Sequence, residues 1–162
     1  MRSIVIGLGF VAVLGFFLAA GYAEEKIELD KVPKAVMDAV NKKFSGAKIT
    51  GASKEKDEDG KDVYELAFEY KNYKYEVELH PDGSFIAIDR QIEFKELPKA
   101  VQKTLEDKFP KATYKVIEEV TKKDKIEYYE MELVTAEKKQ LEVLVDPSGK
   151  VLKEEKKEDK KD

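Results

Sequence analysis

Cysteine and tryptophan are absent from this 162-residue sequence, and His80 is its only histidine. The lack of cysteine excludes disulfide bonds and a lipid anchor on cysteine. With no cysteine and no second histidine, a zinc site, Cys/His catalysis and a Ser-His-acid triad are unsupported. His80 itself precedes the Pro81-Asp82-Gly83 segment, which predicts a polar residue leading into a turn. We therefore expect no cofactor, and a fold that relies on its apolar core.

Excess positive charge is also lacking, because 34 acidic residues outnumber 30 Lys and Arg and give a net charge of −4. Lys and Glu are closely mixed along the chain, which is typical of a well-solvated surface. A nucleic-acid partner is excluded, since it would require a net basic face. The nine glycines fall in the N-terminal segment and at turns, so no glycine-rich phosphate loop is present.

A long apolar run occurs only at the N-terminus, where Arg2 precedes the uncharged segment Ile4–Ala20. Gly21-Tyr22-Ala23 then offers small residues at the positions that a signal peptidase reads. We therefore predict a signal peptide over residues 1–23 and a periplasmic or secreted protein. The alternative is an uncleaved membrane anchor, because this segment is just long enough to span a bilayer.

Apolar residues are missing from the other end as well. Lys153 to Asp162 contains only Lys, Glu and Asp and has nothing to bury. Such a composition predicts disorder, and residues 156–162 are assigned to a disordered charged tail.

Between these ends the sequence repeats itself. Residues 32–36 (VPKAV) return as residues 97–101 (LPKAV), 65 positions later, whereas residues 77–83 return as residues 143–149 at an offset of 66. One residue is therefore gained in between, in the hairpin that joins the middle strands. A period of this length indicates one small α+β unit used twice. We place the two units at residues 24–92 and 93–155.

Each unit begins with a helix, since Pro33 and Pro98 suit a first helical position and an apolar stripe follows. Gly46 and Pro110 end the helices. About four antiparallel strands follow in each unit, because apolar and charged residues then alternate between turn signals. The predicted fold class is α+β: two tandem helix-plus-four-strand repeats, with helices covering one face of an antiparallel sheet. The other face meets water or a partner.

The tandem Pro-x-Ala-Val helix that ends at Phe44 or Phe109, the Tyr-Glu-apolar strand and the Pro-x-Gly turn resemble the PepSY-like family. The resemblance covers about residues 29–155. That family is described as similar to the β-lactamase-inhibitor protein, which has tandem units of helices and four strands in one curved sheet. The resemblance implies an exported, non-enzymatic domain that binds or inhibits another protein.

The uncovered face of the second unit combines apolar residues with carboxylates, which could bind a protein or a basic peptide. An ordinary solvated face is the alternative. Tyr70 and Tyr73, at a predicted hairpin tip, are further candidate anchors, although packing at the edge of the core is an alternative for them. The candidate partner-binding residues are Tyr128, Glu130, Glu132, Val134, Leu144, Tyr70 and Tyr73.

The acidic loop at Asp57, Asp59 and Asp62 is a weak candidate for binding calcium. If Gly60 took position 6 of an EF-hand loop, Leu66 would stand where a closing Glu is required. The second unit has lysines at this place, so a hydrophilic hairpin loop is the preferred interpretation and we predict no metal site.

The sequence thus predicts an exported, non-enzymatic binding or inhibitor-like module of the cell envelope. It would recognise a protein or peptide through the open sheet face and the hairpin loops. The alternative function is a structural or sensing domain that responds to an ion or a small ligand.

Overall fold

The computed structural model describes residues 25–57 and 59–157, which form a nine-stranded antiparallel sheet and two α-helices. The predicted signal peptide, residues 1–23, and the tail beyond residue 157 lie outside the described residues. The strands are β1 (Glu25–Lys26), β2 (Lys48–Lys56), β3 (Asp62–Tyr70), β4 (Tyr73–Leu79), β5 (Phe85–Gln91), β6 (Thr113–Lys122), β7 (Lys125–Val134), β8 (Gln140–Val145) and β9 (Val151–Lys156). The helices are α1 (Lys34–Lys43) and α2 (Lys99–Lys108), each preceded by a short 3-10 turn, η1 (Leu29–Lys31) and η2 (Phe94–Glu96).

All nine strands follow one another in space in the order of the chain. The two repeats meet where β5 pairs with β6, from Ile88 opposite Thr121 to Gln91 opposite Glu118. The predicted α+β class and antiparallel sheet are confirmed, and the two repeats share one sheet. The two-residue strand β1 was not expected; it covers part of the free edge of β2.

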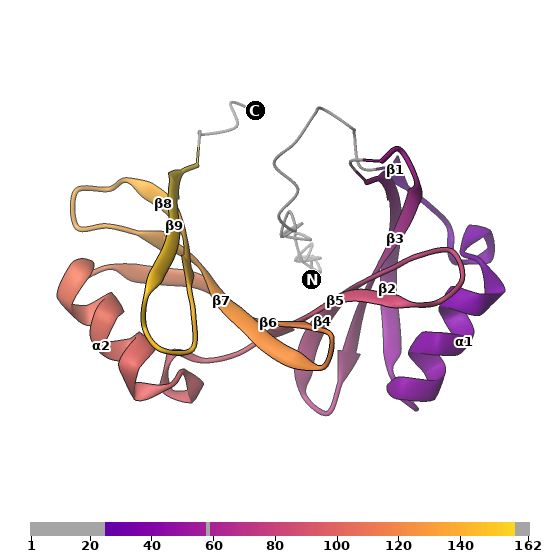
Figure 1. The fold of residues 1–162 in the computed structure, drawn as a ribbon, viewed down its shortest axis with the longest axis horizontal. Helices are drawn as coiled ribbons and strands as arrows, with labels where there is room; N and C mark the ends of the chain where they lie inside the picture. The colour runs from indigo at the N-terminus through magenta and orange to yellow at the C-terminus, as the bar shows by residue number, and fades with distance from the viewer. Residues whose placement is uncertain (1–24, 58, 158–162) are drawn as a thin grey trace, which may run out of the picture.

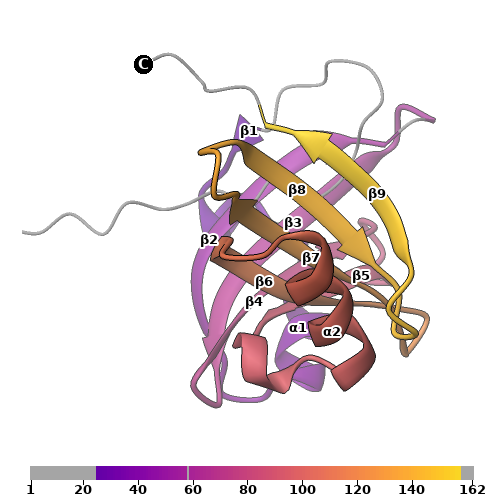
Figure 2. The same cartoon turned by 90° about the vertical axis from the view of Figure 1, so that its left-hand side faces the viewer.

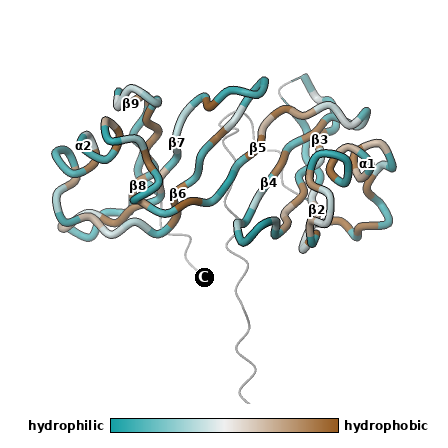
Figure 3. The backbone as a smooth tube through the Cα atoms, turned by 90° about the horizontal axis from the view of Figure 1, so that it is seen from below, coloured by the Kyte–Doolittle hydropathy of each residue, from teal (hydrophilic) through white to brown (hydrophobic). Residues whose placement is uncertain are grey.

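The sheet bends so that its two halves diverge like the arms of a V, with one helix on the outer side of each arm (Figure 1). The view turned by 90° shows the strands running obliquely and curving along their length (Figure 2). Seen from below, the helices lie at opposite ends of the molecule with strands between them (Figure 3). The inner face of the V therefore has no helix against it among the described elements.

The two helices are copies of one another in length and in burial. Val36 and Val40 of α1 are fully buried, as are Val101 and Leu105 of α2. These positions are four residues apart and lie on one side of a helix. Each helix ends at a phenylalanine that follows its last residue, as the sequence predicts.

Each helix packs on its own half of the sheet, so the molecule has two hydrophobic cores. The N-terminal core consists of Val32, Val36, Val40, Phe44, Tyr64, Leu66, Phe68, Val77 and Leu79. The C-terminal core consists of Ile92, Leu97, Val101, Leu105, Phe109, Ile117, Tyr129, Met131, Leu133, Leu141, Val143 and Val145. Both sets alternate along their strands with the side chains of the open face, as expected for a sheet covered on one side.

The Pro-x-Gly turns hold the sheet against the helices. Gly83 has φ +85°, and a Cβ built there would stand 2.5 Å from the carbonyl oxygen of Ala35. Gly149 has φ +91°, and its Cβ would stand 2.7 Å from the carbonyl oxygen of Ala100. Both positions need glycine for two reasons, a left-handed backbone and a close approach to the first turn of a helix.

The hairpin between the middle strands contains the extra residue. In the first repeat, β3 and β4 are joined by the two-residue turn Lys71-Asn72, with φ values of 50° and 69°. In the second repeat, the Thr135 N–H donates to the Lys139 carbonyl at 2.9 Å, with three residues between them. This confirms the predicted place of the insertion.

The predicted start of the charged tail is corrected by the structure. Strand β9 runs through Lys153 to Lys156, and the Lys157 N–H donates to the Gln140 carbonyl at 3.1 Å. This charged segment is ordered because pairing with β8 satisfies its backbone groups, so it forms a strand without burying an apolar face of its own.

Candidate functional site

Four carboxylates lie on adjacent central strands of the open face: Glu78 on β4, Asp89 on β5, Glu118 on β6 and Glu130 on β7. In the sheet register Glu118 stands directly opposite Glu130 across β6 and β7. We call these four residues the acidic row. It crosses the line where the two repeats join, so it belongs to neither repeat alone.

Three members of the acidic row are buried although no helix covers them, and Asp89 is half-buried. The exposed fraction is 7% for Glu78, 6% for Glu118 and 5% for Glu130. Ala87 and Val120, which stand opposite Glu78 and Asp89, are buried as well. Carboxylates are rarely this buried unless they are paired, so the arrangement is costly in its ionised form.

Burial and mutual repulsion raise the pKa of all four carboxyl groups. Burial is the main cause, and it raises the pKa of Glu118 and of Asp89 to about 8. The pKa of Glu78 and of Glu130 rises to about 7, again mainly through burial. Neighbouring carboxylates add to the shift, because each disfavours the charge of the next.

Lysines at the margins of the row offset part of this repulsion. Lys157 pairs with Glu132 and lies 3.8 Å from Glu142. Lys122 lowers the pKa of Glu78 and Asp89, but less than burial raises it. These lysines therefore moderate the pKa of the row without cancelling the effect of burial.

Two oxygen atoms of the row are buried without a hydrogen-bond partner: Oε1 of Glu130 and Oδ1 of Asp89. A buried polar atom without a partner costs about 1–3 kcal/mol, and more when it is charged. A positively charged group brought from outside would give both atoms a partner. Functional sites are where such perturbed carboxylates tend to gather.

The structure brings five of the predicted binding residues together on the open face of β7 and β8. These are Tyr128, Glu130, Glu132, Val134 and Leu144. Their arrangement differs from an exposed apolar patch with an acidic rim, since Leu144 and Glu130 are both only 5% exposed. Tyr128, Glu132 and Val134 are half-buried, and burial followed by the charge of Glu130 raises the pKa of Tyr128. The face has an acidic centre instead.

Tyr70 and Tyr73 lie on the helix side and do not join that group. Tyr70 packs on the N-terminal core, 5.6 Å from Phe44 between ring centroids. Tyr73 crosses to the C-terminal core, and its hydroxyl donates to Glu96 at 2.8 Å. Both side chains therefore have structural contacts, and Tyr73 helps to join the repeats.

The acidic loop residues each have a partner in their own segment. The Asp57 carboxylate accepts N–H bonds from Asp59 and Lys61 at 2.9 and 2.8 Å. Asp62 pairs with Lys54 at 2.8 Å and with Lys56, which lowers its pKa. Within residues 25–57 and 59–157, no three acidic or histidine side chains converge to hold a metal ion.

Asp89 and Glu118 were missed as candidates from the sequence. Asp89 follows the apolar segment Phe85–Ile88, and Glu118 follows Ile117 in a strand that contains two register shifts. For Asp89 the available signal is a charged residue directly after an apolar segment, whereas Glu118 shares its strand with Lys115, Glu119 and Lys122 and has no such signal. How deeply both carboxyl groups are buried depends on the pairing of β5 with β6, which no local pattern reveals.

Neither helix in the described part of the chain has the length and apolar character needed to cross a membrane. No curated protein matches the sequence.

Solved structures with this fold come from Bacteroides species. One from Bacteroides eggerthii, described as "putative periplasmic proteins", has a TM-score of 0.66 at 18% identity, over 77% of this chain and 88% of that one. A DUF2874 family protein from Bacteroides uniformis has a TM-score of 0.64 at 16% identity, over 76% and 88%. A BLIP-like protein from Bacteroides fragilis has a TM-score of 0.62 at 14% identity, over 80% and 92%. At these identities the likeness shows the fold.

The family model described as "Putative beta-lactamase-inhibitor-like, PepSY-like" matches two overlapping regions, residues 22–87 and 62–153. Together they include both helices and eight complete strands of the sheet, β1 to β8, with part of β9. The resemblance that the sequence motifs indicate is thereby confirmed. The chain belongs to the PepSY-like family.

Proposed function

We propose that this protein is a non-enzymatic binding module of the cell envelope, acting in the periplasm or after secretion. Its open sheet face would take a basic segment of a partner protein. The observation that carries the proposal is the acidic row, with its two buried carboxylate oxygens that lack a partner. The family description and the neighbours called periplasmic and BLIP-like support the location and an inhibitor-like role.

A lysine or arginine side chain is the group that fits this place best. Its ammonium or guanidinium would donate to Oε1 of Glu130 and Oδ1 of Asp89, and charge-assisted bonds of this kind are the strong ones. Tyr128 and Leu144 would flank the stem of the side chain. Apolar stems with charged ends suit such mixed surroundings.

An enzymatic role has less support from the geometry. Acid–base catalysis would need a substrate cavity beside the perturbed carboxylates. The pocket of about 490 Å³ in the described structure lies at the end of α2, lined by Phe109 and Leu141 from the C-terminal core. His80 lies at a turn, where its backbone N–H donates to the Ser84 carbonyl at 2.9 Å.

The test is a calorimetric titration with a short arginine-containing peptide and with the same peptide carrying glutamate instead. We expect saturable binding of the arginine peptide alone, weakened about tenfold in an Asp89→Asn/Glu118→Gln variant. Glu69→Gln is the matched control, because Glu69 is an exposed carboxylate of β3 and should leave binding unchanged. Equal binding by the variant, or no preference for arginine, would contradict the proposal.

The alternative function, a sensing domain, is favoured by one observation: the pKa values of the acidic row lie at about 7 to 8. A change of pH in this range would alter the charge of the open face. Lys122, Lys153 and Lys157 are the cations near the row, and Glu55, Glu76, Glu132 and Glu142 are the further carboxylates. A response to pH without any peptide binding would support this alternative.

A further inference from the structure

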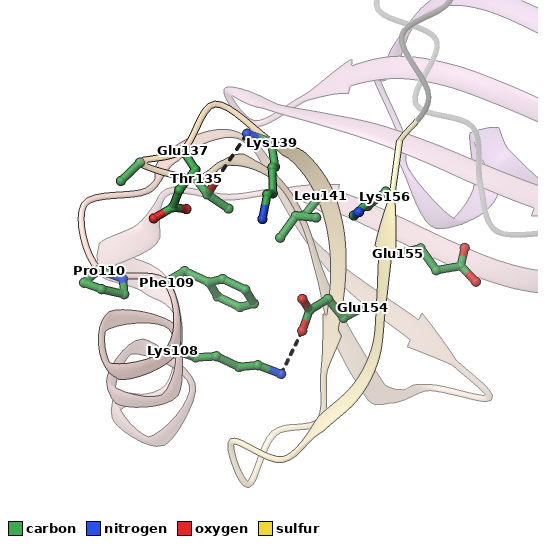
Figure 4. A pocket seen from close by; sticks show the side chains of 11 residues that line it. Lys108, Phe109, Pro110, Thr135, Glu137, Lys139, Leu141, Glu154, Glu155 and Lys156 are labelled. Atoms are coloured by element: carbon green, nitrogen blue, oxygen red, sulfur yellow. Dashed lines mark hydrogen bonds and ion pairs between the residues drawn. The ribbon is translucent and has the colours of Figure 1, made fainter.

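A pocket of about 490 Å³ opens on the helix side of the second repeat, away from the acidic row. It lies between the end of α2, the β7–β8 hairpin and strand β9 (Figure 4). The ring of Phe109 and the side chain of Leu141 line its apolar part, and both belong to the C-terminal core. A volume of this size is within the range of small-molecule sites.

The first repeat fills the equivalent place with aromatic rings. Phe44, the counterpart of Phe109, has four ring neighbours in the N-terminal core. The centroid distances are 4.8 Å to Phe68, 5.2 Å to Tyr75, 5.6 Å to Tyr70 and 6.3 Å to Phe85. These contacts leave the end of α1 closed against its strands.

The second repeat replaces each of these rings with a smaller side chain. At the offsets of 65 and 66, the counterparts of Phe68, Tyr70, Tyr75 and Phe85 are Leu133, Thr135, Leu141 and Val151. Phe109 has no ring neighbour among the described residues. Of these smaller side chains, Thr135 and Leu141 line the pocket. The pocket therefore lies where the rings of Tyr70 and Tyr75 stand in the first repeat.

Lys108, Lys139 and Lys156 line this space together with Glu137, Glu154 and Glu155. Lys139 and Lys156 lie on either side of Leu141 (Figure 4), and neither has an ion-pair partner among the described residues. Lys108 pairs with Glu154 at 2.8 Å and lies 5.5 Å from the Phe109 ring centroid. The carboxylate of Glu155 points away from the pocket and pairs with Lys153 at 2.8 Å.

Lysines accompany the rings in the first repeat too. Lys43 lies 5.3 Å from the ring of Phe85, and Lys71 lies 5.0 Å from the ring of Tyr70. An ammonium group near the face of a ring is attracted to it. A ring that entered the second-repeat pocket would find the same kind of neighbour in Lys108.

We propose that this pocket binds a small aromatic carboxylate. The ring would pack on Phe109 and Leu141, in the place that Tyr70 and Tyr75 occupy in the first repeat. The carboxylate would bind the ammonium groups of Lys139 and Lys156. This site is separate from the open face and does not depend on the function proposed for that face.

The test is an NMR titration of the ¹⁵N-labelled protein with 4-hydroxyphenylacetate. We expect saturable shifts at Phe109, at residues 135–139 and at Leu141, with a Kd of about 1 mM for a ligand of this size. Tyramine, which replaces the carboxylate with an amine, should cause no saturable shift. Cyclohexylacetate, which keeps the carboxylate but not the aromatic ring, should bind at least about threefold more weakly.

A Thr135→Tyr/Leu141→Tyr variant restores the first-repeat residues and should fill the pocket. We expect at least a tenfold loss of binding with a melting temperature no lower than that of the parent protein. A Lys139→Ala/Lys156→Ala variant leaves the core intact and should weaken binding about tenfold, which keeps the test valid if the filled variant does not fold. Glu69→Gln, at an exposed carboxylate of the first repeat, is the control and should bind 4-hydroxyphenylacetate as the parent does.

Three results would overturn the proposal. These are shifts that do not saturate, shifts that persist unchanged in the Lys139→Ala/Lys156→Ala variant, and binding of tyramine as strong as that of 4-hydroxyphenylacetate. Loss of arginine-peptide binding in the Asp89→Asn/Glu118→Gln variant concerns the open face alone, so the two proposals fail independently.

Discussion

The two repeats share a backbone and differ in how they fill it. The first packs five aromatic rings around the end of α1, where Phe68 and Tyr75 stack at 5.3 Å between centroids. The second packs mainly aliphatic side chains around Phe109 and leaves a pocket at the same place. The positions with the same residue in both repeats are those that shape the backbone, whereas the side chains that pack at the end of the helix differ.

The hairpins between the middle strands differ in the contacts that they make with the other repeat. The β3–β4 hairpin of the first repeat contacts the second repeat through Tyr73, whose hydroxyl donates to Glu96. The Arg90 guanidinium of the first repeat lies 4.9 Å from the centroid of the same ring. The β7–β8 hairpin has no following repeat to contact within the described chain. In repeat architectures a terminal unit is typically atypical for this reason.

The largest loss of stability is expected at the turn glycines, which are the same in both repeats. Gly83→Ala and Gly149→Ala should each lower the free energy of unfolding by about 3 kcal/mol, because the new Cβ meets a helix carbonyl and the backbone is left-handed. Urea unfolding followed by circular dichroism measures both changes. A loss in one repeat but not in the other would show that the turns are not equivalent.

A smaller effect should distinguish the repeats. Phe44→Leu removes contacts with four rings and should lower the free energy of unfolding by about 2 kcal/mol, whereas Phe109→Leu should cost about 1 kcal/mol. The same urea experiment compares them. Equal losses would mean that the ring contacts add nothing beyond burial.

The next prediction concerns Glu118, which lies where the two repeats join. The pKa of Glu118 is about 8 in the folded protein, against an ordinary value of 4.5. Between these values the folded state keeps a proton that the unfolded chain has released. The contribution of the protonated Glu118 carboxyl group to stability is therefore complete below about pH 4.5 and is lost as the pH rises to about 8.

Glu118→Gln stays neutral at every pH, so the variant should be more stable than the parent by about 1 kcal/mol at about pH 9. The difference should disappear near pH 4, and Glu69→Gln should change stability at neither pH. Urea unfolding at the two pH values measures this. A Glu118→Gln variant that is no more stable at about pH 9 would argue against buried, mutually repelling carboxylates.

The smallest change in stability is expected at two exposed ion pairs, each made by a lysine at the end of a helix. Lys43 pairs across the repeats with Asp124 at 3.0 Å, whereas its counterpart Lys108 pairs with Glu154 of its own repeat. Asp124→Ala and Glu154→Ala should each change the free energy of unfolding by less than about 0.5 kcal/mol, since exposed ion pairs contribute little. A larger loss for Asp124→Ala alone would make this contact a determinant of how the repeats dock.

The sequence predicts the parts of the fold that depend on local chemistry. Alternation along Tyr64–Tyr70 and the glycine of each Pro-x-Gly turn are visible without knowledge of tertiary contacts. The fold class, the helices and the place of the inserted residue follow from such signals.

The candidate sites depend on contacts between distant segments and were less predictable. Burial of Glu118 and of the Oδ1 atom of Asp89 follows from the pairing of β5 with β6, two strands that a helix separates in the chain. The pocket is lined by Thr135 and Leu141 where the first repeat has Tyr70 and Tyr75, and this difference is visible only when the two repeats are compared. The charged segment Lys153–Lys156 is ordered by the neighbouring strand and not by its own composition.

The strand order has a consequence for how the chain folds. Because each strand pairs with the next one in sequence, the sheet can grow by closing short loops, and its widest gaps contain only a helix and its flanking turns. Strands that a short turn joins can pair fast, because closing a short loop costs little entropy. The N-terminal core consists of residues of the first repeat alone, so the first half can assemble before the second is available. A chain with no cysteine to lock its native state by oxidation gains from this speed, since its strand edges remain unpaired only briefly.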